Sequence, residues 1–309
     1  IDPAVGVIRI DNLAGEPIAT LFSYGCHPVV MGPRAHVAST DFPGAARDVV
    51  EQCLGGLSLF LQACGGNVNP VVGIGYEVDS RDTRRRVGTV LGGEVLKVAA
   101  AVRTHVRRGE PTPIGPLSNI LLKPWQPVSG TSCTYLGAVE EVQTLEYGPL
   151  PSPEEAAAIH EKWKQKLAAD RASGAHQWDI NLAVRFADWS GKLVAAVEHG
   201  HPTLDVVVQG LRVNDMVIVG LSVESFFESG LVIKSQSPFQ HTEVLGYTNG
   251  CSGYLPRAED YPPGGWDVHE LYSLPDMFFQ SYSLPVAFRD DSERRVVEQA
   301  QSVLRKLQS

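Results

Sequence analysis

Several residues near the beginning of the chain have side chains that bind metals or transfer protons. His27 follows the apolar run LFSYG and precedes Pro28, and His36 and Asp41 come shortly afterwards. Imidazole and carboxylate groups serve as metal ligands and as general acids or bases. A histidine at a strand end is also commonly structural, and this spacing matches no short metal-binding motif. A structural and a chemical role are therefore both open here.

The stretch at residues 60–73, FLQACGGNVNPVVG, ends an apolar run abruptly in two glycines and two asparagines. Glycine tolerates positive φ, asparagine tolerates the left-handed region, and proline removes a backbone donor, so a simple turn is one interpretation. The alternative is a functional loop, because α/β enzymes place reacting groups at strand ends and glycine lets the backbone approach a ligand. Other parts of the sequence are needed to choose between a simple turn and a functional loop.

Glu224 lies in IVGLSVESFFESG, directly after an apolar strand and before a predicted helix. Its carboxylate could cap that helix, or it could be an oxygen ligand for zinc, which accepts histidine nitrogen and glutamate oxygen together. The following residues, 245–270, are rich in Gly, Pro and Tyr. Irregular loops of such length tend to be functional.

Alternating strands and helices are expected to position these residues. The last two predicted strands are joined at Asn214 and Asp215, which favours a hairpin. Ser152 and Glu155 form a capping box for a helix that runs to about Gly174. Apolar runs predict strands at 5–10, 17–25, 57–63, 206–213 and 216–223. Two further helices are predicted by apolar faces, the first with Val87, Leu91, Val95, Val98 and Val102, the last with Val296, Ala300, Val303, Leu304 and Leu307.

This order predicts an α/β fold with mixed β-sheets flanked by helices. We treat residues 1–309 as a portion of a single domain, with a possible internal boundary in the Pro-rich region at 108–127. The chain begins inside a predicted strand, without an initiator Met, so we expect a fragment or a processed product.

Composition excludes several classes of protein. The 309 residues are 43% hydrophobic and carry a net charge of −9, which argues against nucleic acid as the main partner. No apolar run is long enough to span a bilayer, and no basic amphipathic anchor for lipid is evident. The 5 cysteines are odd in number and contain no C-x-x-C pair. This mildly favours a reducing, cytoplasmic compartment.

The motifs, taken in order, carry a family resemblance. Besides His27 in its C-H-P context, they are S-T-D-F-P-G at 39–44, Q-A-C-G-G-N-V-N-P at 62–70, V-E-S-F-F-E-S-G at 223–230, and N-G-C-S-G-Y-L-P followed by G-G-W-D. This series resembles the neutral, non-lysosomal ceramidase family, and its broad group of bacterial relatives more than the true ceramidases. The resemblance covers nearly the whole chain and corresponds to the C-terminal part of the catalytic domain.

The resemblance implies a zinc-dependent amidohydrolase fold and a set of roles. In the family, the histidine of the H-P segment and the glutamate after the strand bind zinc, which implies His27 and Glu224 as ligands. A further histidine comes from an upstream T-H-T-H segment, and a tyrosine comes from the late loop. The family's glycine loop carries the serine nucleophile.

This sequence departs from that pattern. Asn69 occupies the serine position, and an amide cannot be the oxygen nucleophile. Trp266 stands where relatives commonly have tyrosine, which leaves Tyr254, Tyr261 and Tyr272 as neighbouring phenols. The upstream histidines are absent from these residues. We therefore expect either a truncated or degenerate homologue or, preferably, a partner chain that carries the N-terminal part of the domain.

The mechanism that we expect is attack by a zinc-activated water on an amide or related acyl C–N bond of a small molecule or an N-acyl lipid. Asp41 or His36 would be the base, or Asp41 would only orient the H-P segment. Asn69 and the amides of Gly65 and Gly66 would bind substrate or the oxyanion. Asn67 and Trp266 complete the predicted substrate site, and Tyr254 is a further catalytic candidate. The competing interpretation is a non-catalytic, ceramidase-like subunit.

Overall fold

The computed structural model describes residues 1–32, 35, 37–75, 80–116, 119–128, 135–200, 203–261, 279–280 and 282–309. The chain forms two compact units. The first comprises Ile1–Ala63 and Asn67–Leu136, and the second comprises Cys64–Gly66 and Gly137–Ser309. The division falls beyond the 108–127 region, which lies inside the first unit. Mixed sheets flanked by helices give the α/β fold predicted from the sequence.

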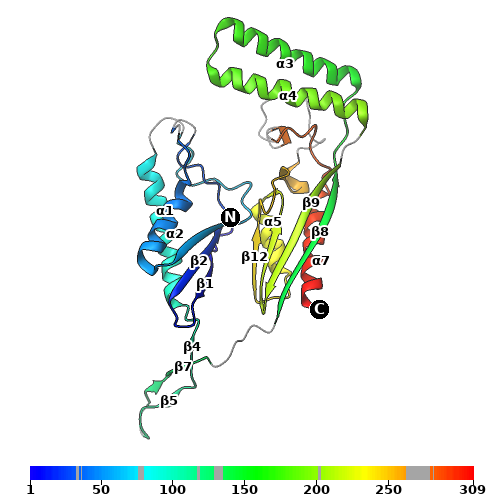
Figure 1. Cartoon of the computed structure of the whole chain (residues 1–309). Helices are drawn as coiled ribbons and strands as arrows, with labels where there is room; N and C mark the ends of the chain where they lie inside the picture. The colour runs from blue at the N-terminus through cyan, green and yellow to red at the C-terminus, as the bar shows by residue number, and fades with distance from the viewer. Residues whose placement is uncertain are drawn as a thin grey trace. The chain divides into compact units, whose positions relative to one another are not determined.

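The first unit is built on a three-stranded sheet in the order β1-β2-β3 (Figure 1). These strands are β1 (Gly6–Asp11), β2 (Pro17–Tyr24) and β3 (Leu57–Gln62). β1 and β2 are antiparallel, whereas β2 and β3 are parallel, with α1 making the crossover between them. All three match strands predicted from apolar runs.

Two helices, α1 (Asp41–Leu54) and α2 (Arg81–Ala101), pack against each other and the sheet. The ring of Phe42 in α1 meets that of Phe60 edge-on, with centroids 6.5 Å apart. A Cβ at Gly88 of α2 would lie 2.5 Å from Ala45 Cβ, so glycine here permits the close helix contact.

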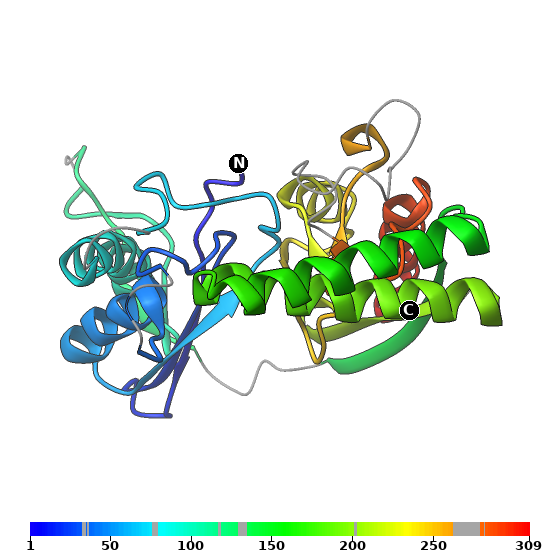
Figure 2. The same cartoon turned by 90° about the horizontal axis from the view of Figure 1, so that it is seen from above.

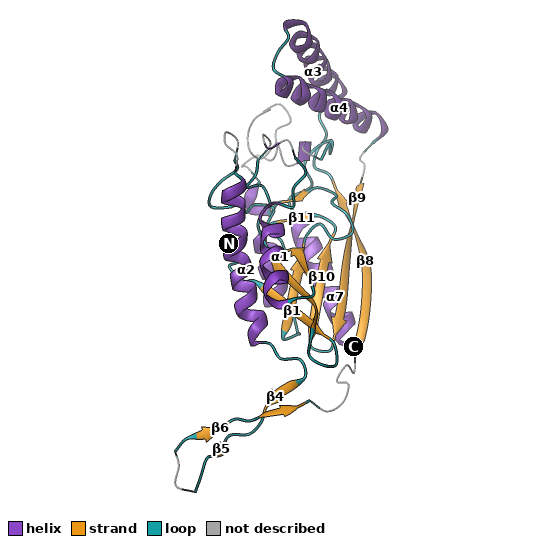
Figure 3. Ribbon diagram, turned by 60° about the vertical axis from the view of Figure 1, so that its left-hand side comes forward, coloured by secondary structure: helices purple, strands orange, loops and turns teal. Residues whose placement is uncertain are grey.

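A hairpin arm extends from the first unit (Figures 1 and 3). Near its base, β4 (Val106–Arg108) pairs antiparallel with β7 (Trp125–Pro127). Farther out, β5 (Thr112–Pro113) pairs antiparallel with β6 (Leu121–Leu122). These short ladders continue one another along the same ribbon, which gives the arm its length.

The second unit contains a four-stranded sheet in the order β12-β10-β9-β8. β9 (Thr203–Val213) and β10 (Met216–Leu221) form the predicted hairpin, in which Asn214 has a φ of 54°. β12 (His241–Leu245) lies parallel to β10, and α5 (Phe227–Ser235) connects them. The remaining strand is β8 (Leu136–Glu146).

The C-terminal helix α7 (Ser292–Gln308) packs along β9. Gly210 of β9 makes room for it, because a Cβ there would lie 2.6 Å from Val303 and Leu307. The predicted apolar face is confirmed by burial to 1% exposure or less of Val296, Ala300, Val303, Leu304 and Leu307.

Two long helices, α3 (Pro153–Ser173) and α4 (Gln177–His199), lie side by side as an antiparallel pair (Figure 2). The capping box of Ser152 and Glu155 forms as predicted, and Gly174 ends α3 in the left-handed conformation. Trp163 and Phe186 stack between the helices at 4.5 Å. Across the described part of the chain, no helix is long and apolar enough to cross a membrane.

Candidate active site

Glu224 is a buried carboxylate at the start of a short parallel ladder in the second unit. After β10 the chain enters β11 (Glu224–Ser225), which pairs with β13 (Tyr254–Leu255), so Glu224 is opposite Tyr254. The Glu224 amide donates to the carbonyl of Gly253 at 2.8 Å. The residue is 3% exposed. A carboxylate removed from water to this degree requires polar partners.

Tyrosine hydroxyls supply those partners. The hydroxyl of Tyr282 donates to Oε2 of Glu224. Tyr254 and Tyr247 also lie close enough to this carboxylate for its charge and hydrogen bonding to raise their pKa. The rings of Tyr254 and Tyr282 meet edge-on with centroids 5.6 Å apart. Three phenols from separate parts of the chain therefore converge on Glu224, and we call these residues the tyrosine cluster.

Burial and then the negative charge of Glu224 raise the pKa of Tyr247 and Tyr254 far above the usual range. For Tyr282, burial acts with hydrogen bonds to Cys251 and Glu224 to raise the pKa in the same direction. Cys251 Sγ lies 3.1 Å from the Tyr282 hydroxyl, and burial raises the pKa of its thiol. At neutral pH these hydroxyls are protonated and serve as donors.

The loop that carries Tyr247 is fixed by backbone hydrogen bonds. The Tyr247 amide donates to Val223 O at 3.1 Å, and the Ser252 amide donates to Ser222 O at 2.9 Å. Tyr247 has a φ of 55°, a left-handed conformation that is rare for a bulky residue. Such strain is typical of functional sites, where surrounding contacts enforce it.

The two glycines of the 60–73 loop lie against the Glu224 strand. The amides of Gly65 and Gly66 both donate to Ser225 O, at 3.1 and 2.9 Å. Because these donors are used within the fold, the oxyanion role expected for them is not supported by this geometry. A Cβ at Gly66 would lie 3.0 Å from Glu224 O and 3.1 Å from Glu224 Cγ. Glycine is required here for close backbone approach to Glu224, rather than for ligand access.

In the first unit, His27 is half-buried and its amide donates to Val68 O at 2.9 Å. Asp41 is 4% exposed and its carboxylate accepts hydrogen bonds from the amides of Met31, at 2.8 Å, and Phe42, at 2.7 Å. Its own φ is 49°. Asp41 thus ties the segment that follows His27 to the start of α1, in keeping with an orienting role.

The remaining predicted residues lie either on the surface of the first unit or outside the described residues. Asn67 and Asn69 are exposed residues of the first unit. His36 and Trp266 lie outside the described residues, as does Tyr272. Of the residues predicted from sequence, Tyr254, Gly65 and Gly66 are brought to Glu224. The sequence analysis did not identify Tyr247 or Tyr282 as site residues. The Gly-rich context of Tyr247 was the signal that could have pointed to it.

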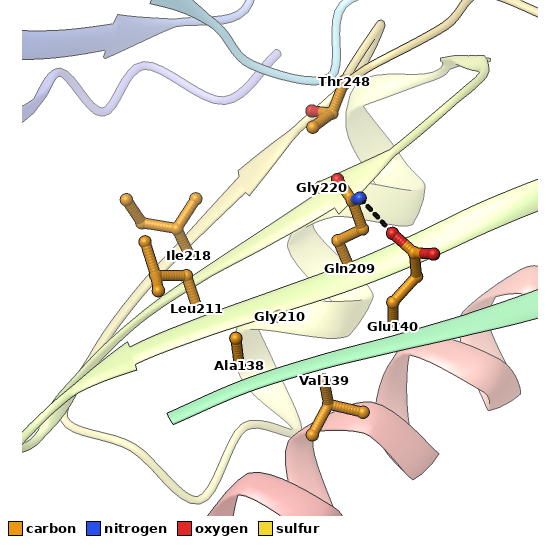
Figure 4. Close-up of a pocket in the computed structure, with 9 residues that line it drawn as sticks. All are labelled: Ala138, Val139, Glu140, Gln209, Gly210, Leu211, Ile218, Gly220 and Thr248. Carbon is orange, nitrogen blue, oxygen red and sulfur yellow. Dashed lines mark hydrogen bonds between the residues drawn. The ribbon is translucent and has the colours of Figure 1, made fainter. Parts of the chain in front are cut away.

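A separate hollow of about 400 Å³ lies on the four-stranded sheet of the second unit (Figure 4). Gln209 and Glu140 are joined across it by a hydrogen bond of 2.5 Å. Gly220 is needed beside it, because a Cβ there would come within 2.5 Å of Thr248. The hollow is lined by Ala138, Val139, Glu140, Gln209, Gly210, Leu211, Ile218, Gly220 and Thr248. None of these residues belongs to the tyrosine cluster or to the site predicted from the sequence.

Within the described ranges, no group of three or more His, Cys, Asp or Glu side chains is arranged to hold a metal ion. The oxygen atoms around Glu224 nevertheless fit part of a zinc site. A cation would balance the buried charge of this carboxylate, and carboxylate oxygen is an accepted zinc donor.

The whole chain superposes on solved ceramidase structures. One is a ceramidase complexed with C2, with a TM-score of 0.58 and 13% identity, and it is matched over 100% of this chain and 48% of its own. Another is the neutral ceramidase of Pseudomonas aeruginosa, with a TM-score of 0.57 and 16% identity, matched over 100% and 47%. The chain has a ceramidase-like fold and spans about half the length of these proteins. No family model and no curated protein sequence matches it.

Proposed function

We propose that this chain is part of a zinc-dependent amidohydrolase that cleaves an amide or related acyl C–N bond in a small molecule or an N-acyl lipid. The observation that carries the proposal is Glu224, a carboxylate 3% exposed and bound by tyrosine hydroxyls, in a chain with a ceramidase-like fold. Carboxylates in such environments are typical of catalytic or metal-binding positions.

Glu224 and His27 are the protein ligands in this proposal. Zinc, when bound, supplies Lewis-acid chemistry and lowers the pKa of a water molecule. Since catalytic zinc usually has three protein ligands, the others would come from outside these 309 residues. A second polypeptide with the N-terminal part of the domain is the proposed source. The finding that the chain spans 48% of a structural neighbour is compatible with that source.

The residues around Glu224 have distinct proposed roles. Tyr282 holds the carboxylate in one orientation. Tyr254 is the donor that we assign to the substrate oxygen, because its hydroxyl is protonated and would be free to turn from Glu224 to the substrate once that carboxylate binds a metal. Asn69, whose side chain is exposed, would bind a polar group of the substrate but not attack it. Asp41 orients the His27 segment, and His36 stays the predicted base.

A second function is favoured by one specific feature. Asn69 stands where the family has serine, which is what a non-catalytic, ceramidase-like subunit would show. Such a subunit would keep the fold to bind a ligand or a partner chain. The zinc content of the purified protein distinguishes the two functions, because a non-catalytic subunit that has lost its active site would not hold stoichiometric zinc.

The test compares Glu224→Gln with Glu228→Gln in the complex purified with any partner chain. Glu228 is a matched control, since it pairs with Arg257 at 3.6 Å and is not part of the tyrosine cluster. We expect wild type and Glu228→Gln to contain zinc and to hydrolyse a member of a fluorogenic N-acyl amide panel. Glu224→Gln should lose about a hundredfold in kcat/KM together with its zinc. Unchanged zinc and activity in Glu224→Gln would refute the assignment, and a zinc-free, inactive wild type would favour the non-catalytic subunit.

A further inference from the structure

The hairpin arm of the first unit, described at residues 103–116 and 119–128, has an apolar tip. Ile114 is 56% exposed, Ile120 65%, Leu121 56% and Leu122 54%. The Ile114 amide donates to Ile120 O at 3.1 Å, so the tip is a paired ribbon and not an open loop. Aliphatic side chains gathered in this way on a surface mark an interaction site.

The tip is apolar on both of its faces. Leu121 and Leu122 are consecutive residues of β6, so their side chains leave opposite faces of the ribbon. A folded protein partner would cover one face and leave the other in water. A fluid apolar medium covers both. The geometry therefore favours the hydrocarbon of a lipid bilayer over a protein surface.

The base of the arm is cationic. Two guanidinium groups lie over the Trp125 ring, those of Arg103 at 5.0 Å and Arg108 at 4.0 Å from the ring centroid. The whole chain carries a net charge of −9, yet Glu110 is the one acidic residue of the arm's sequence. Its cationic residues are Arg103, Arg107, Arg108 and Lys123. Tryptophan at the headgroup level with cations beside it is the arrangement found at membrane interfaces.

The tip also lowers the cost of entering a membrane. Unpaired backbone N–H groups are expensive in lipid, and Pro111, Pro113 and Pro116 have none. Trp125 comes three positions after Leu122, which is roughly 10 Å of extended chain. Interfacial segments bury their apolar residues to a depth of about 5–10 Å. The arm's length is thus matched to shallow insertion, with Trp125 at the boundary.

We propose that this arm docks on anionic lipid membranes, with Ile114, Ile120, Leu121 and Leu122 among the acyl chains and the cationic base on the headgroups. The proposal does not rest on the hydrolase assignment, although it would bring the chain to N-acyl lipids. It revises the expectation that the chain has no basic anchor. The arm could not be predicted from the sequence, because its apolar and cationic residues alternate in blocks along the chain. Folding of the hairpin gathers the apolar blocks at the tip and the cationic blocks at the base.

The test is co-sedimentation of the full chain with phosphatidylcholine vesicles that contain or lack phosphatidylserine. Wild type should sediment with the anionic vesicles, and less at high salt. Leu121→Glu/Leu122→Glu should lower the partition coefficient at least about tenfold. Arg107→Ala and Lys123→Ala should each lower it about fivefold. The matched control is Leu13→Glu/Val90→Glu, which makes the same charge change at positions 101% and 76% exposed.

Equal vesicle binding by the control and the tip variant would overturn the proposal, as would no binding by wild type. A tip-dependent dimer in sedimentation velocity, without vesicle binding, would instead assign the tip to a second copy of the chain. Circular dichroism should show that every variant is folded. Hydrolysis of a soluble amide should be unchanged in the tip variant, so failure of the hydrolase assignment and failure of the membrane assignment give different results.

Discussion

The hydroxyl of Tyr282 donates a hydrogen bond to the carboxylate of Glu224, a residue 58 positions earlier in the chain. The backbone of Glu224 is paired with Tyr254 in the β11–β13 ladder, and Gly66 lies against the Cγ of its side chain. The orientation of this carboxylate is therefore decided by segments that are distant in sequence.

Tyr282→Phe removes the hydroxyl that holds Glu224 and keeps the ring that packs on Tyr254. We expect a loss of about 2 kcal/mol in the free energy of unfolding, because a buried charged acceptor loses a donor. If Glu224 binds zinc, affinity should fall at least about tenfold. Urea unfolding and zinc titration measure the two effects. Tyr261→Phe is the control, since its hydroxyl makes a contact of 3.5 Å to Arg289 O, and an equal effect there would argue against a specific role for Tyr282.

Gly66→Ala should disturb the site through a contact and not through charge. The new Cβ would lie 3.0–3.1 Å from Glu224 O, Glu224 Cγ and Phe226 Cδ1. Overpacking of this kind costs about 1–3 kcal/mol, and activity should fall with it. The control is Gly93→Ala in α2, where a Cβ meets nothing within 4 Å and should stabilise the helix by about 1 kcal/mol. Thermal unfolding should show a lower Tm than wild type for Gly66→Ala and a higher Tm for Gly93→Ala.

Asp41→Ala leaves the amides of Met31 and Phe42 without their acceptor. Buried donors without partners cost about 1–3 kcal/mol each, so we expect marked destabilisation. Asp41→Asn keeps one acceptor oxygen and suits a φ of 49°, so it should recover part of the loss. If Asp41 were instead the catalytic base, Asp41→Asn would be fully stable and inactive, which denaturation and rate measurements would reveal together.

Burial, with the added charge of Asp41, raises the pKa of the Cys26 thiol to about 11 from an ordinary 9.0. The unfolded chain therefore releases this proton first as pH rises. The stability that the neutral thiol contributes is present below pH 9.0 and is lost as pH rises towards about 11. Cys26→Ala should show a smaller alkaline decline in urea midpoint than wild type. Cys53→Ala, which removes an exposed thiol, should decline as wild type does.

Local signals in the sequence were sufficient for many elements. The capping box at Ser152, the turn at Asn214 and the apolar face of α7 all formed where predicted. Each depends on residues a few positions apart, whose spacing dictates a cap, a turn or a buried face. For the same reason, Glu224 could be placed at a strand end and Gly65 and Gly66 in a tight loop.

The sequence by itself determined the α/β class and the position of Glu224 at the end of a buried strand, because both follow from local periodicity. Only the tertiary structure decided that Tyr282 holds this carboxylate, that the glycine amides bind Ser225, and that the arm separates an apolar tip from a cationic base. Those relationships join residues that are far apart in the chain or that meet across a ribbon. Chain folding, and not residue spacing, sets the distances between them.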